Sequence, residues 1–204
     1  MNKYFALMVV LLATIATQAQ EVYFYTGKNI TNYDYKDASG TSNPNLQAGL
    51  GSFYEMGYAM PINDSNFSYA FGVTMNEFNA VGGDAFSSYS WNTEYLGIQN
   101  ALSYSFLKIK GFSFDVKAGV TVATMVYGKQ VLNQAYYDLL DEKDFSGVQI
   151  FPNAALQANY NMTKRSYLSL GYAFTKRIDI GNNSAEELTF NTSQIQFGIH
   201  FSVK

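Results

Sequence analysis

Cysteine is absent from the 204-residue chain, and histidine, proline and tryptophan are scarce. The lack of cysteine excludes disulfide frameworks, thiol nucleophiles and cysteine-ligated zinc or iron–sulfur clusters. A single histidine leaves little for a multi-histidine metal centre, so we expect no metal site and no cofactor. The sequence also lacks the Walker and dinucleotide-binding glycine patterns, which excludes the common phosphate-binding loops.

Charged residues are also few. Thirteen basic and 16 acidic residues make up 14% of the chain, against about 25% in ordinary soluble domains. The net charge of -3 offers no basic surface, so nucleic acid is not an expected partner. Aromatic residues reach 17%, which argues against intrinsic disorder. The mean hydropathy is nevertheless only -0.10, so the apolar residues must be unevenly distributed.

The N-terminus predicts export. An apolar run at residues 4–15 follows Lys3, and Thr17-Gln18-Ala19 places small residues at the two positions that a signal peptidase reads. We therefore expect residues 1–19 to be a cleaved signal peptide and residues 20–204 to form one domain. No later segment approaches 18 consecutive apolar residues, so no transmembrane helix is expected.

The rest of the chain alternates apolar and polar residues with period two, as strands with two unlike faces do. In residues 112–126, the even positions are mostly apolar and the odd positions are mostly small or polar. This pattern predicts eight strands, at residues 22–35, 46–60, 67–75, 96–106, 112–126, 148–162, 168–174 and 195–203. The first strand is mixed in parity, which suggests a bulge.

Short and long connections alternate between these strands. Three short turns, at residues 61–66, 107–111 and 163–166, separate four long polar loops at 36–45, 79–93, 127–146 and 179–191. Bacterial membrane barrels pair short periplasmic turns with long outer loops, and their strands cross with about 9–11 residues. The predicted fold is therefore all-β, an eight-stranded antiparallel up-and-down transmembrane β-barrel with both chain ends in the periplasm.

Two kinds of closed barrel fit eight such strands. A soluble lipocalin-like barrel has its large apolar residues inside, whereas a membrane barrel turns them to lipid. The apolar parity of strands two to eight carries no charge before Lys176, and the other parity is rich in small and polar residues. We therefore expect lipid outside and a narrow polar lumen. Interfacial aromatic girdles are predicted at Tyr58, Phe67, Tyr104, Phe106, Phe112, Tyr127, Tyr160 and Phe201.

Three stretches make the chain resemble a known family. They are the signal-peptide end Thr17-Gln18-Ala19-Gln20, the run Glu94-Tyr95-Leu96-Gly97-Ile98 leading into residues 101–106, and the closing strand at residues 194–201. Over residues 20–204 the chain resembles the small outer-membrane β-barrel proteins of the OmpX/OmpA-like, porin-type group. The resemblance implies a monomer in the cell outer membrane, in contact with its lipids, including lipopolysaccharide, and with the barrel-insertion machinery. Many members end on Phe or Trp, whereas this chain ends Phe201-Ser202-Val203-Lys204.

The first candidate site is a polar network in the lumen, formed by Glu55, Asp115, Lys117, Arg177 and His200. Buried charges must pair, so we expect a salt-bridged plug, although a gate would use the same residues. His200 could instead act as a general base. A lipid-modifying enzyme needs such a group on the lipid face, and the parity turns His200 inward. No catalytic residue is therefore expected.

The second candidate site is a surface contact formed by aromatic residues of the outer loops. These residues are Phe86, Tyr89, Trp91, Tyr136 and Tyr137. The neighbouring acids Asp138, Asp141, Glu142 and Asp144 lack the spacing of an EF-hand, so we interpret them as a solvated loop.

The sequence thus predicts a non-enzymatic outer-membrane barrel with an envelope-structural or surface-interaction role through its long outer loops. The alternatives are an accessory barrel of a secretion or assembly machine, a narrow pore, a lipid A-modifying barrel enzyme and a soluble lipocalin-like binder. The partner of the loops is not identified by the sequence.

Overall fold

The computed structural model describes residues 21–36, 39–41, 45–63, 65–83, 88–133, 135–140, 142, 145, 147–178 and 187–203. The predicted signal peptide, residues 1–19, lies outside these ranges. The regular elements in the described part are β-strands. No helix among the described residues is long and apolar enough to span a membrane.

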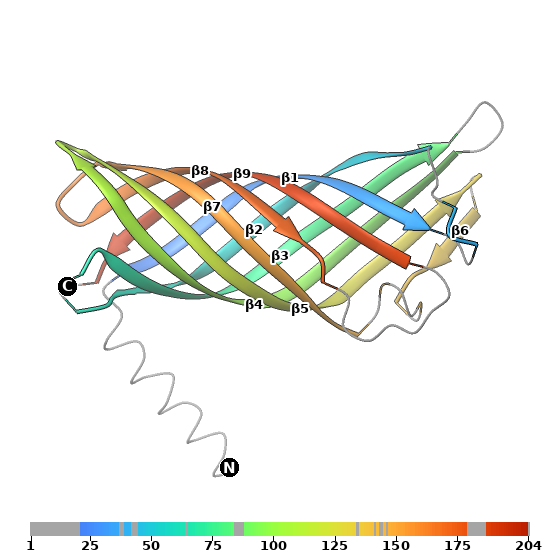
Figure 1. Ribbon diagram of the computed structural model, residues 1–204, viewed down its shortest axis with the longest axis horizontal. Coiled ribbons are helices and arrows are strands. Elements are labelled where there is room, and N and C mark those ends of the chain that lie inside the picture. The colour runs from blue at the N-terminus through green and yellow to red at the C-terminus, as the bar shows by residue number, and fades with distance from the viewer. Residues whose placement is uncertain are drawn as a thin grey trace, which may run out of the picture.

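Eight antiparallel strands form a closed barrel, which confirms the predicted fold (Figure 1). With the short strand β6, which is not part of the barrel, the described strands are β1 (Glu21–Lys36), β2 (Leu46–Pro61), β3 (Phe67–Gly83), β4 (Ser88–Ile109), β5 (Phe112–Leu132), β6 (Ala135–Asp138), β7 (Val148–Asn161), β8 (Ser166–Lys176) and β9 (Glu187–Ser202). Consecutive barrel strands pair with each other, β5 pairs with β7, and β9 pairs with β1 to close the ring. The short strand β6 lies outside the ring and pairs with the far end of β5.

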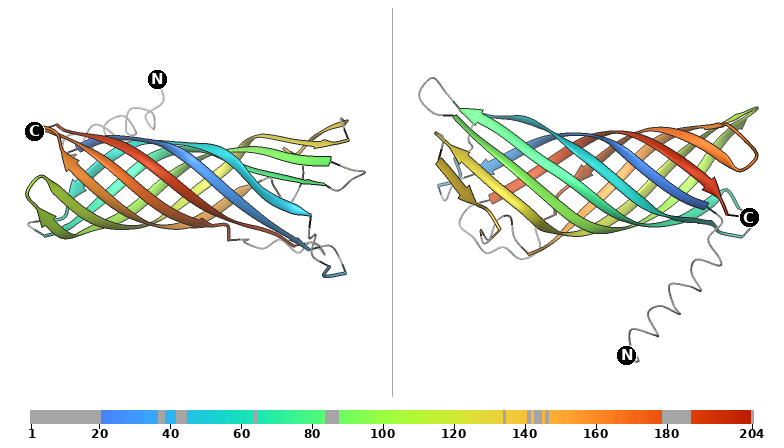
Figure 2. Two further views of the ribbon diagram at one scale, coloured as in Figure 1. Left: turned by 90° about the horizontal axis from the view of Figure 1, so that it is seen from above. Right: turned by 180° about the vertical axis from the view of Figure 1, so that it is seen from behind.

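The two ends of the barrel differ. At one end, here called the turn end, lie the short connections after β2, β4 and β7, the start of β1 and the end of β9 (Figure 1). The other end, here called the loop end, carries β6 and the connections after β1, β3 and β8. Figure 2 shows the same arrangement from two further sides, with the strands strongly tilted along a long cylinder.

The strands extend further toward the loop end than predicted. β3 continues to Gly83 and β4 begins at Ser88, so most of the predicted loop at 79–93 is strand. β5 continues to Leu132, and β6 lies inside the predicted loop at 127–146. The prediction was wrong here because it required an apolar lipid-facing side, which these strand extensions lack.

The predicted bulge in the first strand is also wrong, since β1 pairs with β9 in unbroken register over its whole length. Irregular register occurs instead in β2, between Ala48 and Phe53, and between β4 and β5. The mixed parity of β1 arises because Tyr23 and Tyr25 are buried inside the barrel while Phe24 faces outward. Aromatic residues therefore occupy both faces of this strand.

A belt of large apolar side chains covers the outside of the barrel toward the turn end. It includes Phe24, Met56, Val73, Met75, Leu96, Ile98, Leu102, Val116, Val120, Val122, Leu156, Leu170, Phe174, Ile195 and Phe197. All eight predicted girdle aromatics are exposed as well. Apolar patches of this extent are rare on soluble monomers, and a soluble barrel has the opposite arrangement. The outer surface therefore favours a lipid environment over the lipocalin-like alternative.

The belt ends where outward positions become polar. In β3 and β4 this change comes at Glu77 and Glu94, which are direct cross-strand partners, followed by the pair Asn79 and Asn92. Inward positions change in the opposite sense at the same level, because Phe78 and Tyr95 are buried inside the barrel. The strands therefore continue beyond the belt as a barrel with an apolar core and a polar exterior.

A charge placed within the belt should destabilise the barrel strongly. We expect Ile98→Lys to lower the free energy of unfolding in lipid vesicles by about 2–4 kcal/mol, because the ammonium group would face the bilayer interior. The measurement is a urea titration of the refolded protein, with folding followed by its mobility in SDS gels. Val81→Lys, at an exposed outward position on β3 beyond the belt, is the matched control and should have little effect. Equal losses in the two variants would contradict the assignment of the belt.

Candidate functional site

A buried ion pair crosses the interior of the barrel at the level of the belt. The ammonium Nζ of Lys117, on β5, lies 3.1 Å from Oε1 of Glu55, on β2, and the two side chains are 7% and 1% exposed. The hydroxyl of Tyr23 donates a second hydrogen bond to the same carboxylate oxygen, at 2.8 Å. Lys117 also lies 5.4 and 5.3 Å from the ring centroids of Tyr23 and Tyr25. Both buried charges therefore have partners, as burial requires.

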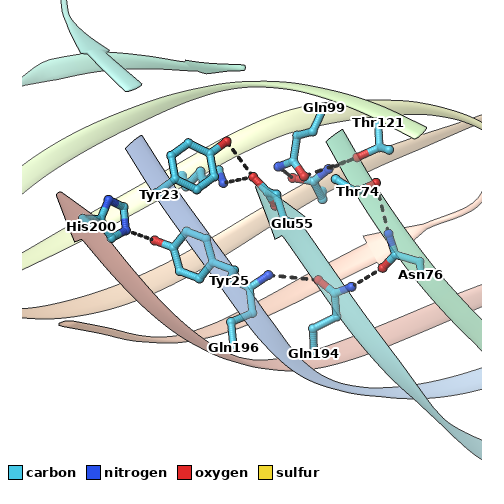
Figure 3. Close-up of polar contacts among 12 residues, drawn as sticks. Tyr23, Tyr25, Glu55, Thr74, Asn76, Gln99, Thr121, Gln194, Gln196 and His200 are labelled. Carbon is cyan, nitrogen blue, oxygen red and sulfur yellow. Dashed lines mark hydrogen bonds and ion pairs between the residues drawn. The ribbon is translucent and has the colours of Figure 1, made fainter. Parts of the chain in front are cut away.

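Amide side chains fill the next layer toward the loop end (Figure 3). Gln196 donates to Gln194 at 3.0 Å, and Gln194 donates to Oδ1 of Asn76 at 2.9 Å. On the other side of the interior, Asn153 donates to the hydroxyl of Thr121 at 3.3 Å. This layer matches the lumen of small and polar residues that the sequence pattern predicts.

His200 lies inside the barrel at the turn end. Its Nε2 is 2.8 Å from the hydroxyl of Tyr25, and its Nδ1 is 3.5 Å from the carboxylate of Glu21. The ring stacks on Tyr167 at 4.1 Å between centroids, and the hydroxyl of Tyr167 donates to Glu21. The imidazole is therefore fixed by aromatic and polar neighbours in the interior, away from the lipid-facing surface.

Asp115 is the remaining acid of this inner layer. Its Oδ2 accepts a hydrogen bond from Asn159 at 2.7 Å, while its Oδ1 has no partner among the described residues. It lines a cavity of about 30 Å³ together with Lys117 and His200. A second cavity, of about 20 Å³, lies between the amide layer and the aromatic layer described below. Each has room for one or two water molecules, so neither is an aqueous channel.

Arg177, the fifth predicted member of the network, lies elsewhere. It is buried just beyond β8 toward the loop end, where Nε donates to Gln149 at 2.9 Å and Nη1 donates to the carbonyl of Leu188 at 3.2 Å. Its guanidinium also lies 5.9 Å from the ring centroid of Phe190. The structure thus brings together Glu55, Asp115, Lys117 and His200 and places Arg177 in a separate layer.

An apolar cluster, here called the mouth cluster, fills the interior at the loop end. Its members come from most strands of the ring and from the connection after β6; they are Tyr33, Phe78, Ala80, Trp91, Tyr95, Ala123, Met125, Leu139, Phe145, Phe151, Leu188 and Phe190. Neighbouring rings lie 4.7–5.7 Å apart in pairs such as Tyr33 with Phe190 and Phe151 with Phe190. Such separations are favourable for aromatic packing, so the cluster closes the interior at this end.

The predicted surface aromatics separate into two groups. Tyr136 and Tyr137, on β6, are 67% and 51% exposed, and the ammonium of Lys129 lies 3.7 Å from the ring centroid of Tyr136. Trp91 is only 9% exposed, so the prediction of an exposed loop residue is wrong for it. It lies within β4 at an inward position, and Tyr89 on the same strand is partly buried. Phe86 lies outside the described residues.

The acidic stretch after β6 forms no metal site in the described part of the chain. Asp138 ends β6 and accepts a hydrogen bond from the backbone of Leu140 at 2.9 Å, which stabilises the turn that follows. Glu142 lies in that turn, and Asp141 and Asp144 fall outside the described residues.

The sequence interpretation missed the mouth cluster. The sequence does contain a sign of this cluster: the apolar side of the strand changes from outward to inward positions after Met75 in β3 and before Leu96 in β4. At Phe78 and Tyr95 the aromatic residues change to the parity that carries small or polar residues elsewhere in the same strands.

Comparison with solved structures relates this fold to outer-membrane barrels. The outer membrane protein OprG from Pseudomonas aeruginosa is 13% identical, with a TM-score of 0.50 over 91% of this chain and 98% of that chain. Neisserial surface protein A is 14% identical, with a TM-score of 0.49 over 88% and 96%. The outer membrane protease OmpT from Escherichia coli is 8% identical, with a TM-score of 0.46 over 90% and 97%. The likeness to OprG shows the fold of a small outer-membrane barrel. No protein-family model and no curated protein matches the chain.

Breaking the buried ion pair should be costly, and removing both charges should not. We expect Lys117→Met to lower the free energy of unfolding by about 3–5 kcal/mol, because it leaves the carboxylate of Glu55 buried without a cation. In the double variant Glu55→Gln, Lys117→Met both charges are gone, so most of the loss should be recovered. The measurement is denaturant unfolding of all three proteins. A double variant less stable than Lys117→Met would contradict this account.

Proposed function

We propose that the protein is a non-enzymatic outer-membrane barrel that presents its loop end at the cell surface for contact with a partner. The observation that carries this proposal is the extension of the sheet beyond the apolar belt. There β3, β4, β5 and β6 have a polar exterior, and Tyr136 and Tyr137 are exposed on β6. Exposed tyrosines on a rigid sheet are suited to binding a partner at a low entropic cost.

The orientation follows from the belt and the turns. Short turns face the periplasm in bacterial barrels, so we assign the start of β1 and the end of β9 to that side as well. Phe201, an exposed outward aromatic near the end of β9, would then lie on the periplasmic side, where the insertion machinery could contact it. The belt would contact outer-membrane lipids, with lipopolysaccharide at the loop end. The protein would do so as a monomer.

The interior supports a closed barrel rather than a pore. The ion pair, the amide layer and the mouth cluster succeed one another along the axis, and the two cavities of this interior hold only a few waters. The polar groups with catalytic potential, above all His200, point into this filled interior. A lipid substrate would have no access to them, which supports a non-enzymatic role over a lipid A-modifying enzyme. An accessory role in a secretion or assembly machine stays compatible with this architecture.

The lack of cysteine allows a direct test of orientation. We expect Tyr137→Cys to be labelled on intact cells by a membrane-impermeant maleimide, because Tyr137 is exposed at the loop end. Lys164→Cys, in the turn after β7, is the matched control and should be labelled only after the outer membrane is permeabilised. The protein should also fractionate with outer membranes and migrate differently in SDS gels before and after heating. If only Lys164→Cys is labelled on intact cells, the orientation is the opposite of the one proposed. A protein that is soluble without detergent would contradict the proposed location in the outer membrane.

The closed interior predicts that the pure protein does not conduct. In planar bilayers we expect no large, stable open steps. Glu55→Gln, Lys117→Met should stay closed as well, because the mouth cluster and the amide layer remain. Long-lived open steps of the unaltered protein would contradict the interpretation of these residues as a plug and would favour a gate formed by the same residues.

A further inference from the structure

The chain inserts one of its own phenylalanines into the mouth of the barrel. Phe145, in the connection between β6 and β7, is 6% exposed. Its ring lies edge to face with Trp91, at 5.5 Å between centroids, and 6.5 Å from the ring of Tyr33. Its backbone carbonyl accepts a hydrogen bond from the hydroxyl of Tyr95, at 3.1 Å. The mouth thus binds this residue by both its ring and its peptide group.

The groups that hold Phe145 belong to the barrel wall. Tyr33 lies on β1, and Trp91 and Tyr95 lie on β4, where all three are also packed against other members of the mouth cluster. The contacts to the ring and to the carbonyl of Phe145, together called its seat, are therefore made by strands of the barrel wall. Phe145 itself comes from the connection between β6 and β7, which leads to Gly147, whose φ of +81° favours glycine.

The seat contains a donor that Phe145 does not use. The indole Nε1 of Trp91 is buried and has no hydrogen-bond partner among the described residues. A buried donor of this kind is uncommon and calls for an explanation. A second carbonyl or carboxylate oxygen beside the ring would satisfy it, and an incoming peptide segment brings such an oxygen within one residue of its aromatic side chain.

We propose that the mouth of the barrel is a binding site for a phenylalanine-like residue of a partner peptide, and that Phe145 is the occupant that the partner displaces. The site takes an aromatic ring against Trp91 and Tyr33, a peptide carbonyl at the hydroxyl of Tyr95 and a further oxygen at Nε1 of Trp91. The inference rests on the proposed function in one respect, that the loop end faces the outside of the cell.

Because Trp91 is the single tryptophan of the chain, its fluorescence reports on this site alone. The probe is N-acetyl-L-phenylalanine amide, which carries one ring and two amide carbonyls, titrated into the purified full-length protein in detergent micelles. N-acetyl-L-leucine amide is the matched ligand without a ring. We expect a saturable change in Trp91 emission with the phenylalanine probe and binding at least 5-fold weaker with the leucine probe.

Two variants separate the contributions of the site. Phe145→Ala empties the seat and should tighten probe binding by 10-fold or more, because the tethered competitor is gone. Tyr95→Phe removes the donor to the carbonyl and should weaken binding by about 2- to 10-fold, as expected for one hydrogen bond. Phe106→Ala, an exposed aromatic near the turn end, is the control and should bind as the unaltered protein does. Folding of each variant is checked by its heat-dependent migration in SDS gels.

Each contrary result has a defined meaning. If Phe145→Ala binds the probe and the unaltered protein shows no response up to the solubility limit, Phe145 is a fixed plug and the proposal fails. If the leucine probe binds equally well, the site does not select an aromatic ring and the proposal fails. If Tyr95→Phe binds the probe unchanged, the hydroxyl of Tyr95 does not bind a peptide carbonyl, which contradicts the proposed recognition of a peptide. The orientation is measured separately. A loop end that faces the periplasm, together with probe binding, would overturn the proposed function and leave the site in place.

Discussion

Closure of the sheet gives each side chain of the ring two possible surroundings, the medium around the barrel or its interior. Each strand of the ring pairs with a neighbour on both sides, and successive residues alternate between the two faces. In this protein the surrounding medium changes along the length of the strands. Around the belt, apolar residues face outward, and the residues between them, such as Glu55 and Lys117, are left inside. Beyond the belt the exterior is polar, and Phe78 and Tyr95 turn inward. The same alternation of side chains between the two faces of a strand thus produces a polar interior around the belt and an apolar interior beyond it.

The two interior layers are stabilised by different forces. The polar layer depends on matched partners, since an unpaired carboxylate or ammonium inside a closed barrel carries the full cost of desolvation. The mouth cluster depends on area and shape, because its aromatic rings lose water without needing a specific partner. A single change should therefore perturb the polar layer sharply, whereas the mouth cluster should tolerate apolar replacements of similar size.

Parity explains how far the sequence predicts this molecule. The alternation around Val120 and Ile98 is unambiguous, so the fold, the belt and the girdles could all be predicted. The same rule identified Glu55 and Lys117 as inward residues. Their contact could not be predicted from the sequence, because the two residues lie 62 positions apart on strands that are not neighbours. Whether such residues meet depends on the tilt of the strands in the barrel. Trp91 was misplaced because its strand was expected to end with the lipid belt.

The separation of the layers also bears on how the protein can act. The mouth cluster lies between the polar interior and the loop end, so an exchange of one aromatic residue at Phe145 need not disturb the pair of Glu55 and Lys117. A partner could then bind at the mouth while the barrel stays closed to ions and solutes. The buried polar layer would keep the envelope sealed, and the changing part would be confined to residues beyond the membrane. This division of roles follows from the point along each strand at which the outward residues change from apolar to polar.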